Sequence, residues 1–366
     1  METQGLITIN NSRIELTINE KIGQIGPVNF RIDSDTPIAP YYKSHWVGKA
    51  ANQNYLNHLV DLQGDFFCMP FGGNNKFLNH DYSCHGPAAN GDWFLTEKTQ
   101  DSLELQMVFP DTETKITKKI SLGEDVIYQD HVIENCTENL PYGYHPILDC
   151  THQLFLSLSS FHTGIVTRES DTPYTNGEYH ALQGHARFFN IEKVPARQIE
   201  KPFEDCSVFP ARRGFVDLIQ MFYYPQDITW STASCPSGGY LWFSFKNPKT
   251  LPSTLFWMEN RGRHFAPWDG INCCIGIEDV CSCFAEGASI SSFENELTKL
   301  GLPTAYQFRR DSAYSVKQIQ GAIKIPSHFS KVVDINFSKT KNEATFIDIN
   351  GQKVTANVNL QFLDIE

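Results

Sequence analysis

The sequence predicts an all-β protein in which two large antiparallel sheets pack face to face, with very little helix. Short runs in which apolar and polar residues alternate dominate the pattern of the 366-residue sequence, and these runs are rich in β-branched and aromatic residues. Such alternation is typical of strands that bury one face. The chain shows no strand–helix–strand alternation and no repeat of fixed period. The pattern therefore disfavours a parallel α/β architecture and a repeat protein.

The predicted strands follow one another along the chain and are separated by turn formers, as in SCPSGG at 234–239 and KNPKTLP at 246–252. The run SLELQMVF shows the alternation best, because it places Leu103, Leu105 and Met107 on one face. The clearest predicted strands are RIELTI (13–18), SLELQMVF (102–109), ITKKISL (116–122), VIYQDHVI (126–133), LFLSLSS (154–160), GFVDLIQMFYY (214–224), GYLWFSF (239–245) and TLFWMEN (254–260).

A hairpin is predicted close to the C-terminus. The segment FIDINGQKVTANV at 346–358 carries Asn350 and Gly351 between two strand-like runs. This dipeptide favours a type I′ turn, because both central residues of that turn need a positive φ.

One helix is predicted, in SSFENELTKLG at 291–301. Ser291 and Glu294 have the spacing of a capping box, and Gly301 can end the helix. Pro303 then blocks its continuation.

The bulk properties indicate a single globular domain that spans residues 1–366. Residues after about 304 are expected to form either closing strands or a small C-terminal appendage. The formal net charge of −12 makes nucleic acid an unfavourable partner, because an acidic surface repels polyphosphate. The first residues show no signal-peptide pattern, and no apolar run reaches the roughly 18 residues of a membrane span. We therefore expect a cytoplasmic protein without a membrane partner, as a monomer or a homodimer.

The ten cysteines are expected to be reduced thiols, because none forms a CxxC motif and no export signal is present. Cys273, Cys274, Cys281 and Cys283 lie close together in the sequence, but their spacing fits no zinc pattern. We expect them to pack in the core, with no metal.

Three stretches carry candidate proton-transfer residues. His145, in PYGYHPILDC, precedes a proline that favours extended backbone, so it is placed at the end of a strand. His85 lies in the loop CHGPAANGDW, where Asn90 and Trp93 offer an amide and a flat apolar face of the kind that binds sugars. Glu278 lies among apolar residues in CCIGIEDVCS, and burial would raise its pKa towards that of a usable base. A structural histidine, an ordinary glycine-rich loop and a salt-bridged glutamate are the alternatives.

A fourth stretch, MENRGRHFAPWDG, crowds charged and aromatic residues into one loop shortly before Glu278. If this loop overhangs the same cleft, Arg263, His264 and Asp269 are candidate ligands of hydroxyl or ring oxygens. A loop held together by its own ion pairs is the alternative.

At these residues the sequence resembles the aldose 1-epimerase family, the galactose mutarotases and their relatives. The resemblance rests on three short motifs that occur in the family's order: His85-Gly86, His145-Pro146 and Gly276-Ile277-Glu278. PFGGN at 70–74 and ENELTKLGLPT at 294–304 look like further family landmarks, and the likeness covers roughly residues 20–310. It implies a galactose mutarotase-like β-supersandwich with a cleft on one sheet.

The resemblance also implies a mechanism for interconverting the anomers of an aldose. Glu278 would act as the general base on the anomeric hydroxyl, and His145 as the general acid on the ring oxygen. The two groups would stand on opposite sides of the acetal, and His85 would bind the sugar or steady the developing charge. No metal and no organic cofactor is required, and the partner is a small sugar.

The chain departs from the family after the PF turn, where members carry a sugar-binding arginine. Here FGGNNKF offers Asn74, Asn75 and Lys76 instead, and Arg263 or His264 of the later loop is expected to supply the missing donor. The departure leaves the identity of the sugar open.

Three other functions remain alternatives at this stage. The first is a non-catalytic carbohydrate-binding protein on the same fold, and the second is a phosphosugar 1-epimerase that uses Arg261, Arg263 and Lys76. The third is a glycosidase that pairs Glu278 with Asp269 or Asp65, since glycosidases need two carboxyl groups about 5–10 Å apart.

Overall fold

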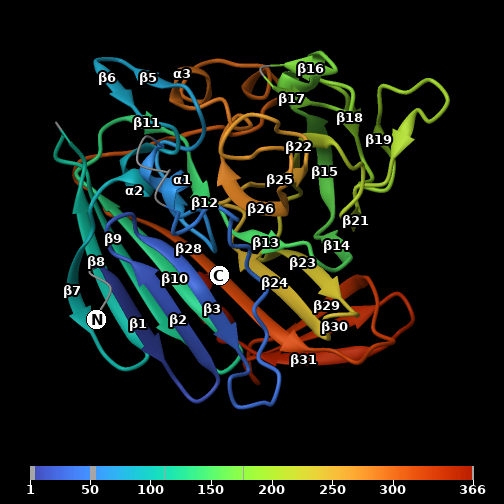
Figure 1. The fold of residues 1–366 in the computed structure, drawn as a ribbon. Helices are drawn as coiled ribbons and strands as arrows, with labels where there is room; N and C mark the ends of the chain where they lie inside the picture. The colour runs from blue at the N-terminus through green and yellow to red at the C-terminus, as the bar shows by residue number, and fades with distance from the viewer. Residues whose placement is uncertain (1–4, 50–54, 111, 176, 365–366) are drawn as a thin grey trace.

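The computed structural model describes residues 5–49, 55–110, 112–175 and 177–364 (Figure 1). Strands dominate this part of the chain, which confirms the all-β prediction. Its α-helices are one-turn segments, and none of its helices is long and apolar enough to cross a membrane. The helices are α1 (Asn57–Val60), α2 (Gly86–Asn90) and α3 (Ala288–Ser291), with 3₁₀ turns at Arg168–Asp171, Thr298–Leu300 and Leu360–Leu363.

A nine-stranded antiparallel sheet forms one of the two large layers. Most of the clearest predicted strands lie in it, and β8 buries Leu103, Leu105 and Met107 as predicted. In spatial order its strands are β21 (Val208–Phe209), β14 (Leu154–Leu158), β23 (Thr229–Cys235), β24 (Tyr240–Lys246), β28 (Tyr314–Lys324), β10 (Val126–Glu134), β9 (Lys115–Leu122), β8 (Ser102–Val108) and β7 (Phe94–Lys98).

An eight-stranded antiparallel sheet forms the second large layer. In spatial order its strands are β18 (Arg187–Phe188), β15 (Phe161–Val166), β22 (Phe215–Tyr223), β25 (Ser253–Asn260), β26 (Cys273–Cys281), β12 (Tyr142–Tyr144) and β4 (Phe67–Cys68), and β13 (Ile147–Asp149) also pairs with β26. The register between β25 and β26 sets Leu255 opposite Glu278 and Trp257 opposite Gly276. This register fixes which side chains share a face with Glu278.

Smaller sheets surround the two layers (Figure 1). Three-stranded sheets are formed by β1 (Leu6–Asn10), β2 (Ile14–Asn19) and β3 (Gln24–Phe30), and by β29 (Val332–Ser338), β30 (Glu343–Asp348) and β31 (Lys353–Asn357). Two-stranded ribbons are formed by β5 (Asn75–Phe77) with β6 (His80–Tyr82), β11 (Asn139–Leu140) with β27 (Tyr306–Gln307), β16 (Tyr174–Thr175) with β17 (Glu178–Tyr179), and β19 (Val194–Pro195) with β20 (Phe203–Glu204).

The main core lies between the two large sheets. Ile275 and Ile277 of β26 belong to the same buried cluster as Leu156 of β14, Trp242 of β24 and Val316 of β28. The other face of β26 belongs to a second cluster, which contains Cys274 and Val280 together with Leu218, Leu255 and Trp257. Because alternate residues of a strand point to opposite faces, Glu278 shares this second, outer face.

The residues after 304 enter both the large sheet and a separate one. Strand β28 lies in the middle of the nine-stranded sheet, whereas β29, β30 and β31 form the sheet that is red at the lower right of Figure 1. Phe346 of β30 packs against Phe243 and Phe245 of β24, with ring centroids 4.8 and 6.0 Å apart. The C-terminal sheet therefore covers the outer face of the nine-stranded sheet.

Two local predictions need correction. The helix predicted at 291–301 is absent: α3 ends at Ser291, and only a 3₁₀ turn at Thr298–Leu300 follows. Asn295 explains this, because its side chain donates to the carbonyls of Ile290 and Phe293 and accepts from the N–H of Leu297 and Thr298, which favours a turn over a helix.

The hairpin at Asn350-Gly351 is confirmed, but its turn differs from the predicted type. Gly351 has a φ of +78°, whereas Asn350 is not among the residues with positive φ, so the turn is not type I′. The Asp348 carboxylate closes the loop by accepting from the N–H groups of Asn350 and Gln352. None of the ten cysteines forms a disulfide, and most of them are buried.

Candidate active site

A cavity of about 390 Å³ opens on the outer face of the eight-stranded sheet. Apolar and aromatic side chains form much of its wall, including Phe66, Leu218, Trp257 and Trp268. A mostly apolar cavity with a few convergent polar groups is typical of small-molecule sites. The polar residues that line it are His58, Cys84, His85, His145, Thr175, Glu178, Arg263 and Glu278.

Glu278 and His145 meet in this cavity. His145 Nε2 lies 3.3 Å from Glu278 Oε1, and their side chains are only 8% and 2% exposed. The fold thus brings together two motifs that lie far apart in the sequence. The expected placement of the two groups on opposite sides of an acetal stays a prediction, and with no sugar between them they are in contact.

The backbone around His145 is fixed by the strands on either side of it. His145 follows β12 and precedes β13, and both strands pair with β26, the strand of Glu278. Its N–H donates to the Phe66 carbonyl and to Asp65 Oδ1, each at 3.0 Å. The Asp65 carboxylate in turn accepts from Gln129 and Gln320, each at 2.7 Å. Asp65 therefore fixes the backbone of His145 and does not line the cavity.

Aromatic rings hold the His145 imidazole in place. Phe66 stacks on it with ring centroids 4.6 Å apart, and His85 meets it edge-on at 5.0 Å. Trp257 closes a third side at 5.9 Å. A ring packed on these sides has few rotamers available, so its Nε2 stays directed at Glu278.

Burial shifts the protonation equilibria of both members of the pair towards their uncharged forms. It raises the pKa of the Glu278 carboxyl well above its usual range, and the Arg263 charge opposes part of this rise. It lowers the pKa of His145 to about 3. Both pKa shifts favour a neutral carboxyl on Glu278 and a neutral imidazole on His145.

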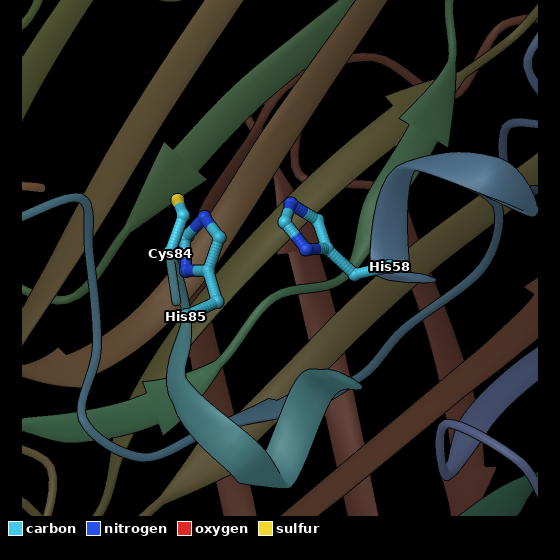
Figure 2. A group of neighbouring side chains, drawn as sticks. All are labelled: His58, Cys84 and His85. Carbon is cyan, nitrogen blue, oxygen red and sulfur yellow. The ribbon is translucent and has the colours of Figure 1, made fainter. Parts of the chain in front are cut away.

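His58, Cys84 and His85 form a second polar group in the same cavity (Figure 2). Figure 2 shows the His58 ring directed towards His85, with Cys84 beside His85. Burial lowers the pKa of His58 to about 4 and that of His85 well below its usual range. His85 also has a φ of +61°, an uncommon conformation for a residue other than glycine.

Arg263 lies in the cavity wall, close to two indole rings. Its guanidinium carbon lies 5.1 Å from the Trp257 ring centroid and 4.9 Å from that of Trp268. Its Nε is 2.7 Å from Glu178 and 3.8 Å from Glu259. Two carboxylates thus match its charge, and the rings provide cation–π contacts.

The other residues predicted to bind substrate lie outside the cavity wall. Trp93 is buried in the main core, where its indole N–H donates to the Ala88 carbonyl. Asn74 is exposed, and so are His264 and Asp269 in the loop after β25.

Asn90 also lies behind the wall, where it supports residues that do line the cavity. Its side-chain amide donates to the Cys84 and Gly86 carbonyls at 2.8 and 2.9 Å. Its Oδ1 lies 2.9 Å from His58 Nδ1. Asn90, which was predicted to contact the substrate, therefore supports residues of the cavity and does not line it.

Sequence reasoning missed several polar or aromatic residues of the cavity, among them Trp257, His58, Cys84 and Glu178. Trp257 carried a usable signal, because the alternation in TLFWMEN puts it on one face with Leu255 and Glu259. No sequence signal marked His58, Cys84 or Glu178, because each lies in a short element or turn whose position depends on the whole fold.

Of the comparisons with known proteins, the one with solved structures found proteins of similar fold. No family model matches the sequence, and no curated protein sequence matches it. Among solved structures, a candidate aldose 1-epimerase from Escherichia coli K12 is similar with a TM-score of 0.59 at 12% identity, over 87% of this chain and 99% of that one. A galactose mutarotase related enzyme from Lactobacillus acidophilus gives a TM-score of 0.58 at 9% identity, over 88% and 98% of the two chains.

A third structure, a galactose mutarotase-like protein from Clostridium acetobutylicum, gives a TM-score of 0.58 at 13% identity, over 87% of this chain and 95% of that one. The matches cover almost the full length of each relative, so the whole architecture is shared. At these identities the likeness establishes the fold and leaves the activity to be argued from the site.

Proposed function

We propose that this chain, which has the galactose mutarotase-like fold, is an aldose 1-epimerase that interconverts the α and β anomers of a sugar. The observation that carries the proposal is the contact between Glu278 and His145, 3.3 Å apart inside a mostly apolar cavity. A carboxyl group and an imidazole that share one proton can remove a proton from one oxygen and supply one to another.

The close contact of the two groups fits the geometry of the reaction. The anomeric hydroxyl and the ring oxygen are bonded to the same carbon, so they lie close together and a base and an acid side by side can reach both. Transfer of the shared proton from Glu278 to His145 gives a carboxylate and an imidazolium, the forms that the family resemblance assigns to base and acid. Each proton transfer contributes about 10²–10⁴-fold to the rate.

In the proposed reaction, Glu278 takes the proton of the anomeric hydroxyl while His145 gives its proton to the ring oxygen. The bond between the anomeric carbon and the ring oxygen breaks, and the carbonyl of the open aldehyde forms. Rotation about the C1–C2 bond presents the other face of the carbonyl. Ring closure then returns the proton from Glu278 to the carbonyl oxygen and the ring-hydroxyl proton to His145, which restores the pair.

The cavity favours a neutral aldose over an anionic sugar. Glu178 and Glu259 already match the charge of Arg263. The other cations considered for phosphate binding lie elsewhere, since Lys76 is exposed beside Asp81 and Arg261 lines a different cavity. The aromatic wall instead suits the C–H faces of a sugar ring.

The arrangement gives less support to a glycosidase. Of the two carboxylates considered as partners of Glu278, Asp269 is exposed outside the cavity and Asp65 is buried behind His145. Glu178 does line the cavity, but it is tied to Arg263 at 2.7 Å. His145 is the group that contacts Glu278.

Polarimetry on freshly dissolved α-anomers of several aldoses tests the proposal. The wild type is expected to accelerate mutarotation of at least one sugar, and Glu278→Gln and His145→Asn are each expected to lower the rate about 10²–10⁴-fold. His264→Asn is the matched control, because His264 is an exposed histidine outside the cavity wall and its loss should leave the rate unchanged. Circular dichroism shows whether each variant is folded.

A wild type that accelerates no sugar in the panel would contradict the catalytic proposal. Sugar-dependent increases in melting temperature would then identify the chain as a carbohydrate-binding protein on this fold. Full activity in Glu278→Gln would contradict the assignment of the base.

A further inference from the structure

We propose that His58, Cys84 and His85 form a three-ligand site for a transition-metal ion of the zinc type, open to the cavity that holds Glu278 and His145. The inference goes beyond the proposed epimerase function and does not depend on it. Each of the three residues offers one ligand atom, and these atoms lie within 4.8 Å of one another. The three side chains also line one cavity.

The distances suit a metal after a small adjustment. Zn–N bonds of about 2.0–2.1 Å and a Zn–S bond of about 2.3 Å place the ligand atoms of a tetrahedral ion about 3.3–3.6 Å apart. The residues come from two short segments, α1 and the turn before α2, and a bound ion would draw their ligand atoms together by about 1 Å. Figure 2 shows the His58 ring facing the His85 ring, with the Cys84 thiol beside His85.

A hydrogen bond to the Asn90 amide orients His58 as a ligand. Asn90 Nδ2 donates to the carbonyls of Cys84 and Gly86, which fixes Asn90 Oδ1 as the atom that faces His58 Nδ1 at 2.9 Å. Because this oxygen can only accept, His58 carries its proton on Nδ1 and its Nε2 has a free lone pair. Histidine ligands of metals are oriented in this way, by a hydrogen bond from the second ring nitrogen.

The same amide joins the two ligand-bearing segments. It contacts His58 on α1 and the backbone on both sides of His85, so Asn90 holds all three ligands in one arrangement. The His85 ring has one competing partner, since Gly72 N–H lies 3.4 Å from its Nδ1. Ligation by His85 therefore costs one long hydrogen bond.

The ligand types indicate which ions fit. A thiolate with two imidazoles favours zinc and related transition metals over magnesium and calcium, which prefer oxygen ligands. Three protein ligands leave one tetrahedral position open, as in catalytic zinc sites. The fourth ligand would come from the cavity, as water or as a hydroxyl of a bound sugar.

Metal titration of the tag-free, reduced protein tests the site. Co²⁺ is expected to bind at one ion per chain and to give a thiolate-to-cobalt charge-transfer band, and Zn²⁺ should displace it while Mg²⁺ should not. Cys84→Ser should abolish the band. Cys273→Ser is the matched control, because Cys273 is also a partly exposed thiol but lies outside this cavity, and it should leave the band unchanged.

Asn90→Ala provides a second test that keeps all three ligands. Loss of this outer hydrogen bond should weaken Zn²⁺ binding about 10–100-fold. Absence of stoichiometric Co²⁺ binding in the folded wild type would overturn the proposal, and so would a charge-transfer band that survives in Cys84→Ser. These readouts are independent of mutarotation, so failure of the metal site and failure of the epimerase proposal can be told apart.

Discussion

Gly276→Ala is expected to lower the mutarotation rate about 10²-fold while the protein stays folded. Gly276 lies two residues before Glu278 on β26, so both positions point to the cavity face. A methyl group at Gly276 would lie 2.3 Å from Glu278 Oε1, whereas ordinary contacts begin at 3.4 Å. The carboxylate must therefore move by about 1 Å, and a misplacement of this size costs about 10²-fold in rate.

The fold should tolerate the same methyl group. The three heavy atoms nearest to it all belong to the Glu278 side chain, at 2.3, 3.2 and 3.3 Å, and no backbone atom is among them. A flexible side chain can yield, and alanine is favoured over glycine in a strand by about 0.5–1 kcal/mol. The free energy of unfolding should consequently change by no more than about 1 kcal/mol.

Polarimetry and urea denaturation of Gly276→Ala measure the two effects separately. Gly73→Ala is the matched control, because Gly73 lines the same cavity but its added methyl group would meet only the Ala285 carbonyl at an ordinary 3.4 Å. The reasoning is refuted if Gly276→Ala retains the wild-type rate. A large loss of stability would show instead that the strand itself cannot accept the methyl group.

Three further substitutions probe how the site is supported. Asp279→Asn should lower the free energy of unfolding by about 3–5 kcal/mol, because it leaves the buried Lys246 ammonium without its carboxylate; urea denaturation measures this, and an unchanged midpoint would contradict it. Burial raises the pKa of Glu259 to about 7, so its contribution to stability is present below its ordinary value of 4.5 and is lost as pH rises through about 7. Glu259→Gln should remove this loss, and thermal melts from pH 4 to about 8 that keep the wild-type slope would contradict the assignment. Gly86→Ala should destabilise the protein by more than about 1 kcal/mol, because Gly86 has a φ of +70° and a Cβ there would lie 2.0 Å from the Met69 carbonyl oxygen; an unchanged melting temperature would count against this.

The strands of the two large sheets were predictable because their signal is local. Alternation in SLELQMVF and VIYQDHVI reports burial on one face, and the structure has β8 and β10 there. The helix at 291–301 was mispredicted for an equally local reason. Its capping-box pattern competes with the side chain of Asn295, and the hydrogen bonds of that amide decide the outcome in favour of a turn.

The candidate site was only partly predictable, because its members come from separate segments. Glu278 and His145 were found through motifs that set one polar residue among strand and turn formers. His58 and Cys84 enter the cavity through α1 and the turn before α2, and neither position carries a pattern of its own. Trp93 was predicted to bind substrate but lies in the main core. An indole in a glycine-rich loop is compatible with either place, so the sequence pattern did not separate the two.

Glu278 and Asp279 are neighbours on β26, and their side chains point to opposite faces of the sheet. Asp279 faces the inter-sheet core, where its oxygens accept from four donors: Lys246 Nζ at 2.5 Å, Thr254 Oγ1 at 2.6 Å, Gln318 Nε2 at 2.7 Å and Ser244 Oγ at 2.9 Å. Glu278 faces the cavity, and within the described chain its buried Oε1 has no hydrogen-bond donor.

Native proteins rarely leave a buried carboxylate oxygen without a donor, because the lost solvation costs about 1–3 kcal/mol or more. The contrast between a saturated Asp279 and an unsatisfied Glu278 supports the proposed role of Glu278, because a sugar hydroxyl in the cavity would supply the donor that Glu278 lacks. In the proposed enzyme, the reactivity of Glu278 and the rigidity of its strand would have one origin, the alternation of side chains across β26.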